Sequence, residues 1–440
     1  MNFRDINFFK QLRFSFLYKV IALFISFMLT RYMLEYLGLE LYGIWAVLLT
    51  FINWIVFFDF GIANGVKNKV SESLSVKKSV EAREYISTGY IILSIFAIIV
   101  YIVFFIISFF IDWTTIFNTK IVTNNNLQII ILVTLFFILL NFVNSIIIAV
   151  FNATQNASLI VLQQLLFQGF TLVLLFFLLI YTDRSLLNMA LIYGISLLLS
   201  TLILSIYFYR KNNHLLPYLR FYKSSKVKSI FSLGMKFFYL QLTILIILST
   251  DTMILTQLLG ASIVTSYDIL FKYFGLLLII HTIINTPLWS MYTEAYQKND
   301  HEWIEKTLKK MVWIMFIYLF IAIALYFSAE LVITLWIGKI ELYLDKSNYI
   351  YMLLMVLMLI WYSIFAYFTN GINKTTNQLI SATIGALINI PLSIYFVKYM
   401  DMGLNGVLLA TIISLSIFGI TGPIQAVIEI KKMKDLSNEK

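Results

Sequence analysis

The segment FFDFGIANGVKNKVSESL at residues 57–74 decides the fold, because an apolar helix ends within it and a polar, basic segment begins. Its first residues are as hydrophobic as a membrane span. Asp59, Gly61 and Gly65 then interrupt the apolar pattern, and lysines follow. An ionisable residue inside an apolar helix is costly in lipid and marks either a functional position or the end of the span. The rest of the chain decides between these interpretations.

The composition indicates a polytopic membrane protein. The chain has 440 residues, of which 61% are hydrophobic and only 12% charged, whereas soluble domains contain about 25% charged residues. Apolar runs long enough to cross a bilayer recur from end to end. The net charge of +10 is therefore a topology signal before it is a nucleic-acid signal. The chain has no cysteine, which excludes disulfides and thiolate chemistry.

Twelve apolar segments are predicted to span the membrane as helices. The first is too long for the hydrophobic region of a cleavable signal peptide, so we expect it to be a retained anchor. Each segment is long enough to cross a hydrocarbon core of about 30 Å with some tilt. The segments are 14–37, 41–65, 85–111, 127–150, 158–181, 186–209, 230–257, 263–289, 311–337, 349–370, 379–399 and 405–428.

The distribution of lysine and arginine predicts the orientation. If the N-terminus is cytoplasmic, 23 of the 32 Lys and Arg residues fall in the inside segments. The outside segments then hold only Lys120, Arg184, Lys339, Lys346 and Lys398. Cytoplasmic loops carry the excess of positive charge, so both termini are predicted to be cytoplasmic.

The longest basic connection divides the chain into two lobes. We predict an N-terminal six-helix lobe at 1–209, a basic cytoplasmic linker at 210–229 and a C-terminal six-helix lobe with a short basic tail at 230–440. The lobes begin alike, with FSFLYK at 14–19 and FSLGMK at 231–236, and a Leu-Gly pair follows each first span at residues 37–38 and 259–260. Equal orientation of the two lobes suggests a parallel repeat, as in some transporters.

Ionisable residues within the spans concentrate in the first two helices of each lobe. The other spans hold essentially none. Because such residues tend to face a cavity or a partner, we predict a water-accessible cavity lined by spans 1, 2, 7 and 8. The predicted fold is therefore an all-α polytopic membrane protein, with about twelve transmembrane helices in two six-helix bundles around a central cavity. The ionisable residues within spans 1, 2, 7 and 8, which we predict to line the cavity, are the cations Lys19, Arg31, Lys236 and Lys272 and the acids Glu35, Asp59, Asp251 and Asp268.

Simpler interpretations compete with a cavity role. Lys19 and Lys236 lie where their side chains can reach the inner headgroups. Asp268 can pair with Lys272, and Arg31 with Glu35, because each pair is one helical turn apart. Four further polar residues are expected to have structural roles. His281 is more consistent with a packed, hydrogen-bonded histidine than with a proton relay. The glutamines of span 5 are more consistent with joining helices than with binding a ligand; they are Gln163, Gln164 and Gln168.

The segment at 57–74 resembles the motif that ends the second helix of bacterial polysaccharide repeat-unit flippases of the Wzx type. These belong to the multidrug/oligosaccharidyl-lipid/polysaccharide (MOP) exporter superfamily. STDTMIL at 249–255 and PLWSMYTEAYQKND at 287–300 are similar to that family's corresponding segments. The resemblance covers the whole chain. It implies two six-helix bundles around a cavity, and movement of an undecaprenyl-pyrophosphate-linked oligosaccharide to the outer leaflet by alternating access.

The ionisable residues predicted to line the cavity suit transport of a lipid-linked pyrophosphate, but other functions remain as alternatives. A pyrophosphate needs cations in a low-dielectric path, for which the four cations above are candidates. The four acids balance them and are candidates for coupling to H+ or Na+. Rivals are a drug/cation antiporter of the same fold, a flippase for a lipid-linked peptidoglycan precursor, and a membrane enzyme such as a polysaccharide polymerase. We expect no enzyme activity, metal or cofactor, because no catalytic constellation or phosphate-binding loop occurs.

The expected partners are the lipid-linked oligosaccharide, the membrane lipids and a polysaccharide polymerase that would extend the product. The expected location is the bacterial cell membrane, which the protein would cross many times.

Span 2 is predicted to end near Gly65, and Gly61 and Gly65 are spaced for close helix approach. Capping of the helix by Gly65 is the alternative.

Overall fold

The computed structural model describes residues 3–57, 61–75, 77–154, 156–338, 342 and 344–438. Within these ranges the side chains of several residues are not described, namely those of residues 3–16, 53, 55–57, 75, 157, 232–249, 286, 287, 290, 294, 297 and 436–438. Asp59 and the side chain of Lys236 therefore lie outside the described part of the chain.

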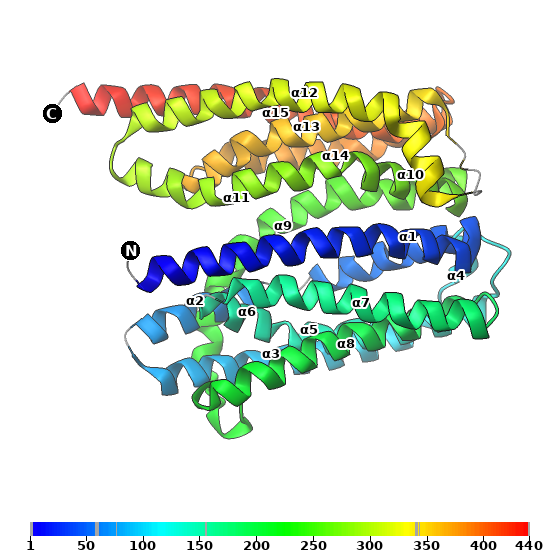
Figure 1. The fold of residues 1–440 in the computed structure, drawn as a ribbon, viewed down its shortest axis with the longest axis horizontal. Coiled ribbons are helices and arrows are strands. Elements are labelled where there is room, and N and C mark those ends of the chain that lie inside the picture. Colours follow the sequence, from blue (N-terminus) through cyan, green and yellow to red (C-terminus); the bar gives the residue numbers. More distant parts are fainter. Residues whose placement is uncertain are drawn as a thin grey trace. The chain divides into compact units, whose positions relative to one another are not determined.

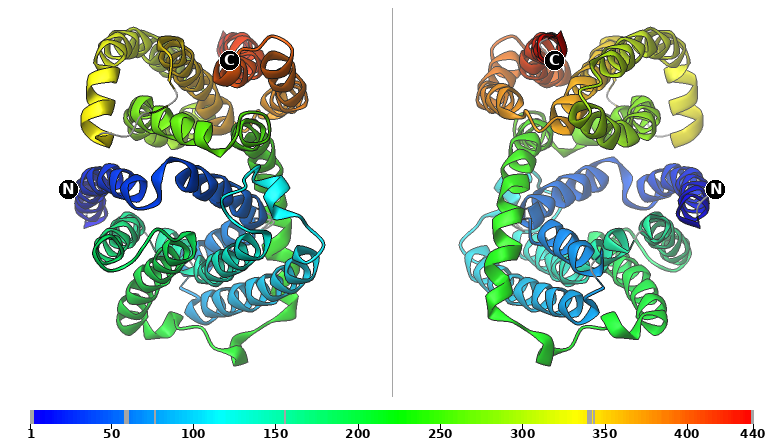
Figure 2. Two further views of the ribbon diagram at one scale, coloured as in Figure 1. Left: turned by 90° about the vertical axis from the view of Figure 1, so that its right-hand side faces the viewer. Right: turned by 90° about the vertical axis from the view of Figure 1, so that its left-hand side faces the viewer.

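The described chain is helical, and its long helices run side by side within each of two compact units (Figures 1 and 2). The units are Met1–Gln241 and Leu242–Lys440. The first contains α1 (Phe3–Phe57), α2 (Ile62–Ser75), α3 (Ser79–Ser108), α4 (Trp113–Ile116), α5 (Asn124–Asn144), α6 (Ile146–Ala153), α7 (Ala157–Tyr181), α8 (Leu186–Lys211), η1 (Asn213–Leu215) and η2 (Leu219–Phe221). Helix α9 (Ser224–Leu259) begins in the first unit and ends in the second. The second continues with α10 (Ala261–Phe274), α11 (Leu276–Gln297), α12 (His301–Ile337), α13 (Lys346–Gly371), α14 (Thr376–Lys398) and α15 (Gly403–Asn438).

Each predicted span other than the second, 41–65, lies in helix over nearly its whole length. Among the described residues, nine helices are long and apolar enough to cross a membrane, or ten if the bent pair α10 and α11 forms one span. Helix α1, which is broken at Gly38, holds the first predicted span and residues 41–57 of the second. The predicted all-α, multi-pass membrane fold is confirmed. The predicted lobe boundaries at 209–210 and 229–230 stay predictions.

The Leu-Gly pairs mark equivalent turns in the two units. Gly38 has φ 74° and ψ 178°, and Gly260 has φ 93° and ψ 163°. Side chains other than glycine are strained at such positive φ values, so glycine lets the chain reverse between consecutive spans. The similarity first noticed in the sequence therefore extends to the backbone.

The segment at 57–74 includes the end of one helix and most of the next. Helix α1 ends at Phe57, and Gly61, with φ 69°, precedes α2. The predicted end of span 2 near Gly65 is wrong, because Gly65 lies inside α2. A Cβ on Gly65 would stand 2.3 Å from the carbonyl oxygen of Ile230 in α9. Gly65 is therefore a close-approach glycine and not a helix cap.

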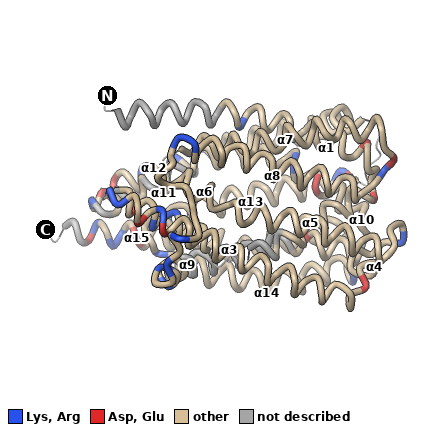
Figure 3. Tube along the Cα trace, turned by 90° about the horizontal axis from the view of Figure 1, so that it is seen from below, with Lys and Arg blue, Asp and Glu red and all other residues tan. Residues whose placement is uncertain are grey.

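Charge gathers at helix ends. In Figure 3 the helices are tan along most of their length, while blue and red segments gather near the α9 label in the first unit and the α15 label in the second. Long apolar stretches with charged ends are the arrangement that a bilayer requires.

Candidate functional site

Asp251 is the centre of a buried polar network in the second unit. Its side chain is 0% exposed and lies in α9. The hydroxyl of Thr411 in α15 lies 2.9 and 3.0 Å from its two carboxylate oxygens, and the hydroxyl of Tyr267 in α10 lies 3.5 Å from one of them. Two consecutive helices, α9 and α10, and the distant helix α15 therefore meet at one carboxylate.

The network continues through a side-chain amide. The Nδ2 of Asn389 in α14 donates to the Thr411 hydroxyl at 3.1 Å, and the Thr250 hydroxyl donates to Asn389 Oδ1 at 3.2 Å. The donors thus form a directed chain that ends on Asp251. Among the described residues, no basic side chain pairs with this carboxylate.

An unpaired buried carboxylate has a definite chemical consequence. Taking an ion out of water costs several kcal/mol in effective terms. A hydrogen bond to a charged group returns only about 1.5–3 kcal/mol. The carboxylate is therefore a candidate to bind a proton, or a small cation held by the surrounding oxygen atoms. Oxygen ligands of this kind suit hard cations.

Asp268 and Lys272 form an ion pair on one face of α10. The Lys272 ammonium lies 2.7 Å from the Asp268 carboxylate, and the two side chains are 34% and 26% exposed. The predicted pairing one turn apart is confirmed. Their predicted roles at a cavity stay predictions.

The intramembrane charges of the first unit are arranged differently. Lys19, Arg31 and Glu35 are all exposed on α1. Among the described residues, no ion pair joins Arg31 to Glu35, so the suggestion that they pair is not supported. The predicted cavity depends on how the two units are placed, and it stays a prediction.

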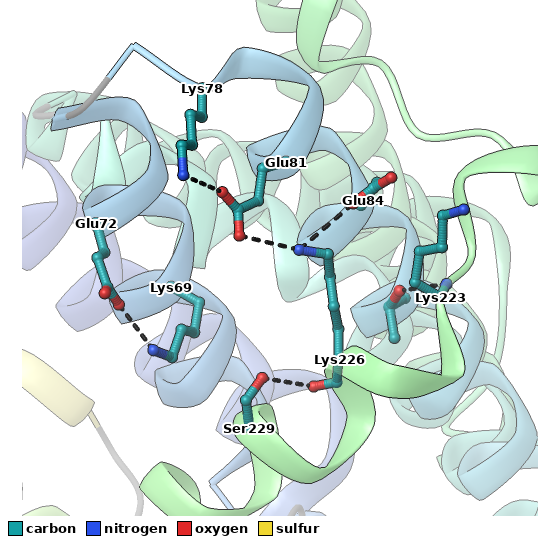
Figure 4. Close-up of polar contacts among 9 residues, drawn as sticks. Lys69, Glu72, Lys78, Glu81, Glu84, Lys223, Lys226 and Ser229 are labelled. Carbon is teal, nitrogen blue, oxygen red and sulfur yellow. Dashed lines mark hydrogen bonds and ion pairs between the residues drawn. The ribbon is translucent and has the colours of Figure 1, made fainter.

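The basic connection at 210–229 is tied to α3 of the first unit (Figure 4). Lys226 bridges Glu81 at 3.2 Å and Glu84 at 3.4 Å, and the backbone N–H of Lys223 donates to the Thr88 hydroxyl at 3.1 Å. The Arg83 guanidinium lies over the Phe221 ring, 4.3 Å from its centroid. The polar segment after span 2 and the basic connection therefore form one packed end of the unit.

A second buried polar network, in the first unit, has no charge. The Nε2 of Gln163 in α7 donates to Ser200 and Thr201 of α8, at 3.1 Å each. The Thr201 hydroxyl donates to Asn141 of α5 at 2.8 Å. Gln163 therefore joins α7 to α8 and, through Thr201, to α5, as predicted, whereas the same role for Gln164 and Gln168 stays a prediction. His281 is also packed as predicted, with the Asn285 amide 2.8 Å from its Nε2.

Comparison with known proteins places this arrangement in a family. A family model described as "Polysaccharide biosynthesis protein" matches residues 10–293, well over half of the chain. The chain belongs to the polysaccharide biosynthesis protein family. A second model, described as "MatE", matches residues 238–395. The match confirms the resemblance inferred from the segments at 57–74, 249–255 and 287–300.

A curated relative of this polysaccharide biosynthesis protein is similar over nearly its whole length, and solved structures share its fold. A putative O-antigen transporter from Salmonella typhimurium is 24% identical over 425 residues, with 92% of each chain covered. An inward-facing multidrug resistance MATE family transporter of the MOP superfamily superposes with a TM-score of 0.75 at 16% identity, covering 96% of both chains. A MOP superfamily transporter from Pyrococcus furiosus superposes with a TM-score of 0.66 at 17% identity, again with 96% coverage. The fold is that of the MATE transporters, with two helical bundles.

The hydrogen-bond network of Asp251 was not predicted from the sequence. Two of its members, Asn389 and Thr411, lie in spans 11 and 12, which hold essentially no ionisable residues. The residues that mark this site in the sequence are polar but uncharged. Asn389 places a side-chain amide within one apolar span, and Thr411 places a hydroxyl within the next. An amide in mid-span is costly unless it has a partner, which is how the position could have been found.

Proposed function

We propose that this chain is a flippase that moves oligosaccharide repeat units linked to undecaprenyl pyrophosphate from the cytoplasmic to the outer leaflet of a bacterial cell membrane. The observation that carries the proposal is the family match over residues 10–293, supported by full-length similarity to the Salmonella O-antigen transporter. Alternating access of two bundles would move the headgroup. The polyprenyl chain would stay in lipid.

Exposed cations in the first unit support a path for the pyrophosphate. Lys19 and Arg31 are exposed on α1 and have no acidic partner among the described residues. Lys272 is already engaged by Asp268. We therefore assign the main attraction for the phosphate groups to Lys19 and Arg31, with Lys236 as a further candidate from the sequence.

Asp251 supports a coupling role within this proposal. Its burial and its lack of a basic partner among the described residues favour binding of H+ or Na+. Glu35 and Asp268 are weaker candidates, because Glu35 is exposed and Asp268 has a lysine partner. Binding and release of the ion would change the hydrogen bonds that join α9 to α15. Such a change gives transport a link to an ion gradient.

The leaflet location of lipid-linked oligosaccharide in cells lacking the protein tests the proposed function. Accumulation on the cytoplasmic side, relieved when the protein is restored, is the expected result. Accumulation of single units on the outer leaflet would point to a polymerase. No accumulation, together with altered drug sensitivity, would favour the antiporter of the same fold.

The cation path has its own test. Arg31→Gln and Lys19→Gln should each reduce export at matched protein abundance, because a pyrophosphate loses a charge-assisted contact. Lys120→Gln is the matched control, since Lys120 is an exposed lysine outside the predicted spans. Wild-type export in both α1 variants would contradict the path while leaving the leaflet assay unaffected.

A further inference from the structure

The second unit has a groove of about 490 Å³ between α12 and α15, with α13 at its floor. Trp361 and Phe365 form the floor, while Trp313 and Val427 line the two sides. The volume falls in the range of small-molecule sites, about 300–1,000 Å³. The side walls are open to the surroundings, since Trp313 is 71% and Val427 67% exposed.

One end of the groove is polar and basic. Glu305 accepts from Lys309 at 2.8 Å through one oxygen and from Lys434 at 2.6 Å through the other. Lys431 also lines the groove and has no acidic partner among the described residues. Two lysines therefore engage the two oxygens of one carboxylate, and a third lysine lines the same groove.

The groove has one polar end and one apolar end because the charged start of α12 lies beside the charged end of α15. Helix α12 begins at His301 and α15 ends at Asn438, so the charged residues lie where one helix starts and the other finishes. These segments are among those predicted to face the cytoplasm from their lysine content. Farther along both helices the exposed residues are apolar, including Phe316, Phe320 and Ile420. The groove thus runs from the expected inner headgroup level into the hydrocarbon.

We propose that this groove binds an anionic diacyl phospholipid of the cytoplasmic leaflet. The phosphodiester lies at the lysines, nearest Lys431, and one acyl chain lies between Trp313 and Val427 over Trp361. Charge complementarity identifies the lipid class. Basic pockets on the cytoplasmic side of transmembrane helices favour anionic headgroups, and an exposed tryptophan is typical of the interface. The site is independent of the transported substrate.

A single phosphodiester fits this charge better than a pyrophosphate does. The carboxylate of Glu305 lies among the lysines and repels an anion of higher charge at close range. Two of the three lysines already donate to that carboxylate. That leaves Lys431 as the groove lysine without an acidic partner among the described residues, and one ammonium group suits the single phosphate of a phosphatidylglycerol headgroup.

The test is lipid retention by the purified full-length protein in native mass spectrometry, with phosphatidylglycerol and phosphatidylcholine compared. Lys431→Gln should lower phosphatidylglycerol retention about fivefold, the equivalent of the roughly 1 kcal/mol that one lysine contributes at an anionic surface. It leaves the two ion pairs of Glu305 intact. Lys77→Gln is the matched control, an exposed lysine of the first unit without a partner among the described residues.

A second variant tests the apolar part without changing charge. Val427→Trp fills the groove and should also lower phosphatidylglycerol retention. Ile420→Trp, at an exposed position of the same helix, should not. Equal retention by Lys431→Gln and Lys77→Gln would overturn the proposal. So would displacement of the phospholipid by farnesyl pyrophosphate from wild type but not from Lys431→Gln, because the occupant would then be a prenyl pyrophosphate.

Discussion

Each unit contains a buried polar network that joins several helices, and only the network of the second unit includes a carboxylate. In the first unit, Gln163 links α7 to α8 and, through Thr201, to α5. In the second, Thr411 and Asn389 link α15 and α14 to α9. Amides and hydroxyls make up the first network, whereas the second ends on the carboxylate of Asp251.

That difference distinguishes a network that only connects helices from one whose hydrogen bonds can change with protonation or cation binding. A neutral network has one protonation state, so it can only hold helices together, with a modest contribution per bond in a membrane. A carboxylate in the same setting has two states, ionised or bound to a proton or cation. The hydrogen bonds that favour one state do not favour the other. We therefore expect only the second of these two networks to respond to an ion gradient.

Asp251→Asn should have the largest effect on export. The substitution keeps the shape and a hydrogen-bond acceptor but removes the ionisable group. If the ion site is coupled to transport by a typical 1–3 kcal/mol, gradient-driven export should fall about 5- to 150-fold. Thermal stability should be equal or higher, because a neutral amide replaces a buried carboxylate that has no basic partner among the described residues. Export at matched abundance and thermal unfolding in detergent are the two measurements.

The pair of readouts separates the alternatives for Asp251. A purely structural carboxylate would show lower stability and export that falls only with the amount of folded protein. Export at the wild-type level in Asp251→Asn would remove Asp251 from any coupling scheme. Neither result would affect the leaflet assay that tests the flippase itself.

Thr411→Val should have the second-largest effect. It removes the donor to both oxygens of Asp251 and leaves the Asn389 amide without its acceptor. The loss of a hydrogen bond to a charged group is about 1.5–3 kcal/mol, so stability should fall and the pH dependence of export should shift. Thr201→Val in the first unit is the matched control and should cost about 1 kcal/mol without any shift in pH dependence. A shift of the same size in both variants would contradict the distinction.

The positions of the helices were easier to predict from the sequence than the side-chain contacts that join one helix to another. Hydrophobic length alone locates membrane spans, because the bilayer enforces it locally. The Asp268–Lys272 pair was also predictable, since both residues lie one turn apart on one helix. The break at Gly61 was not, because a glycine pair spaced for close approach gives no sign of where one helix stops and the next begins.

The partners of Asp251 could not be predicted for a different reason. Thr411 is 160 residues away, and hydroxyls are common in membrane helices without a specific role. Which hydroxyl meets which carboxylate depends on how α9, α14 and α15 pack together. The contrast between Gln163 and Asp251 likewise emerges only when both neighbourhoods are known.

Gln163→Leu should affect stability only. Two hydrogen bonds of Gln163 are lost, at about 0.6 kcal/mol each in a membrane, while Ser200 and Thr201 keep their bonds to the carbonyl of Leu197. A lower unfolding temperature with unchanged export per folded molecule is the expected outcome. A change in the pH dependence of export would mean that the neutral network also takes part in coupling.

Exchange of the two charges on α10 should have the smallest effect. The double variant Asp268→Lys, Lys272→Asp keeps an ion pair one turn apart, although the reversed order is less favourable along a helix. Because both side chains are partly exposed, the pair is worth only about 0.3–0.5 kcal/mol. We expect near wild-type stability and export in the double variant, measured beside Lys272→Gln. If the double variant exports as poorly as Lys272→Gln, then a cation is needed at that one position. Lys272 would then join Lys19 and Arg31 as a contact for the pyrophosphate, and its pairing with Asp268 would be a resting arrangement that the substrate displaces.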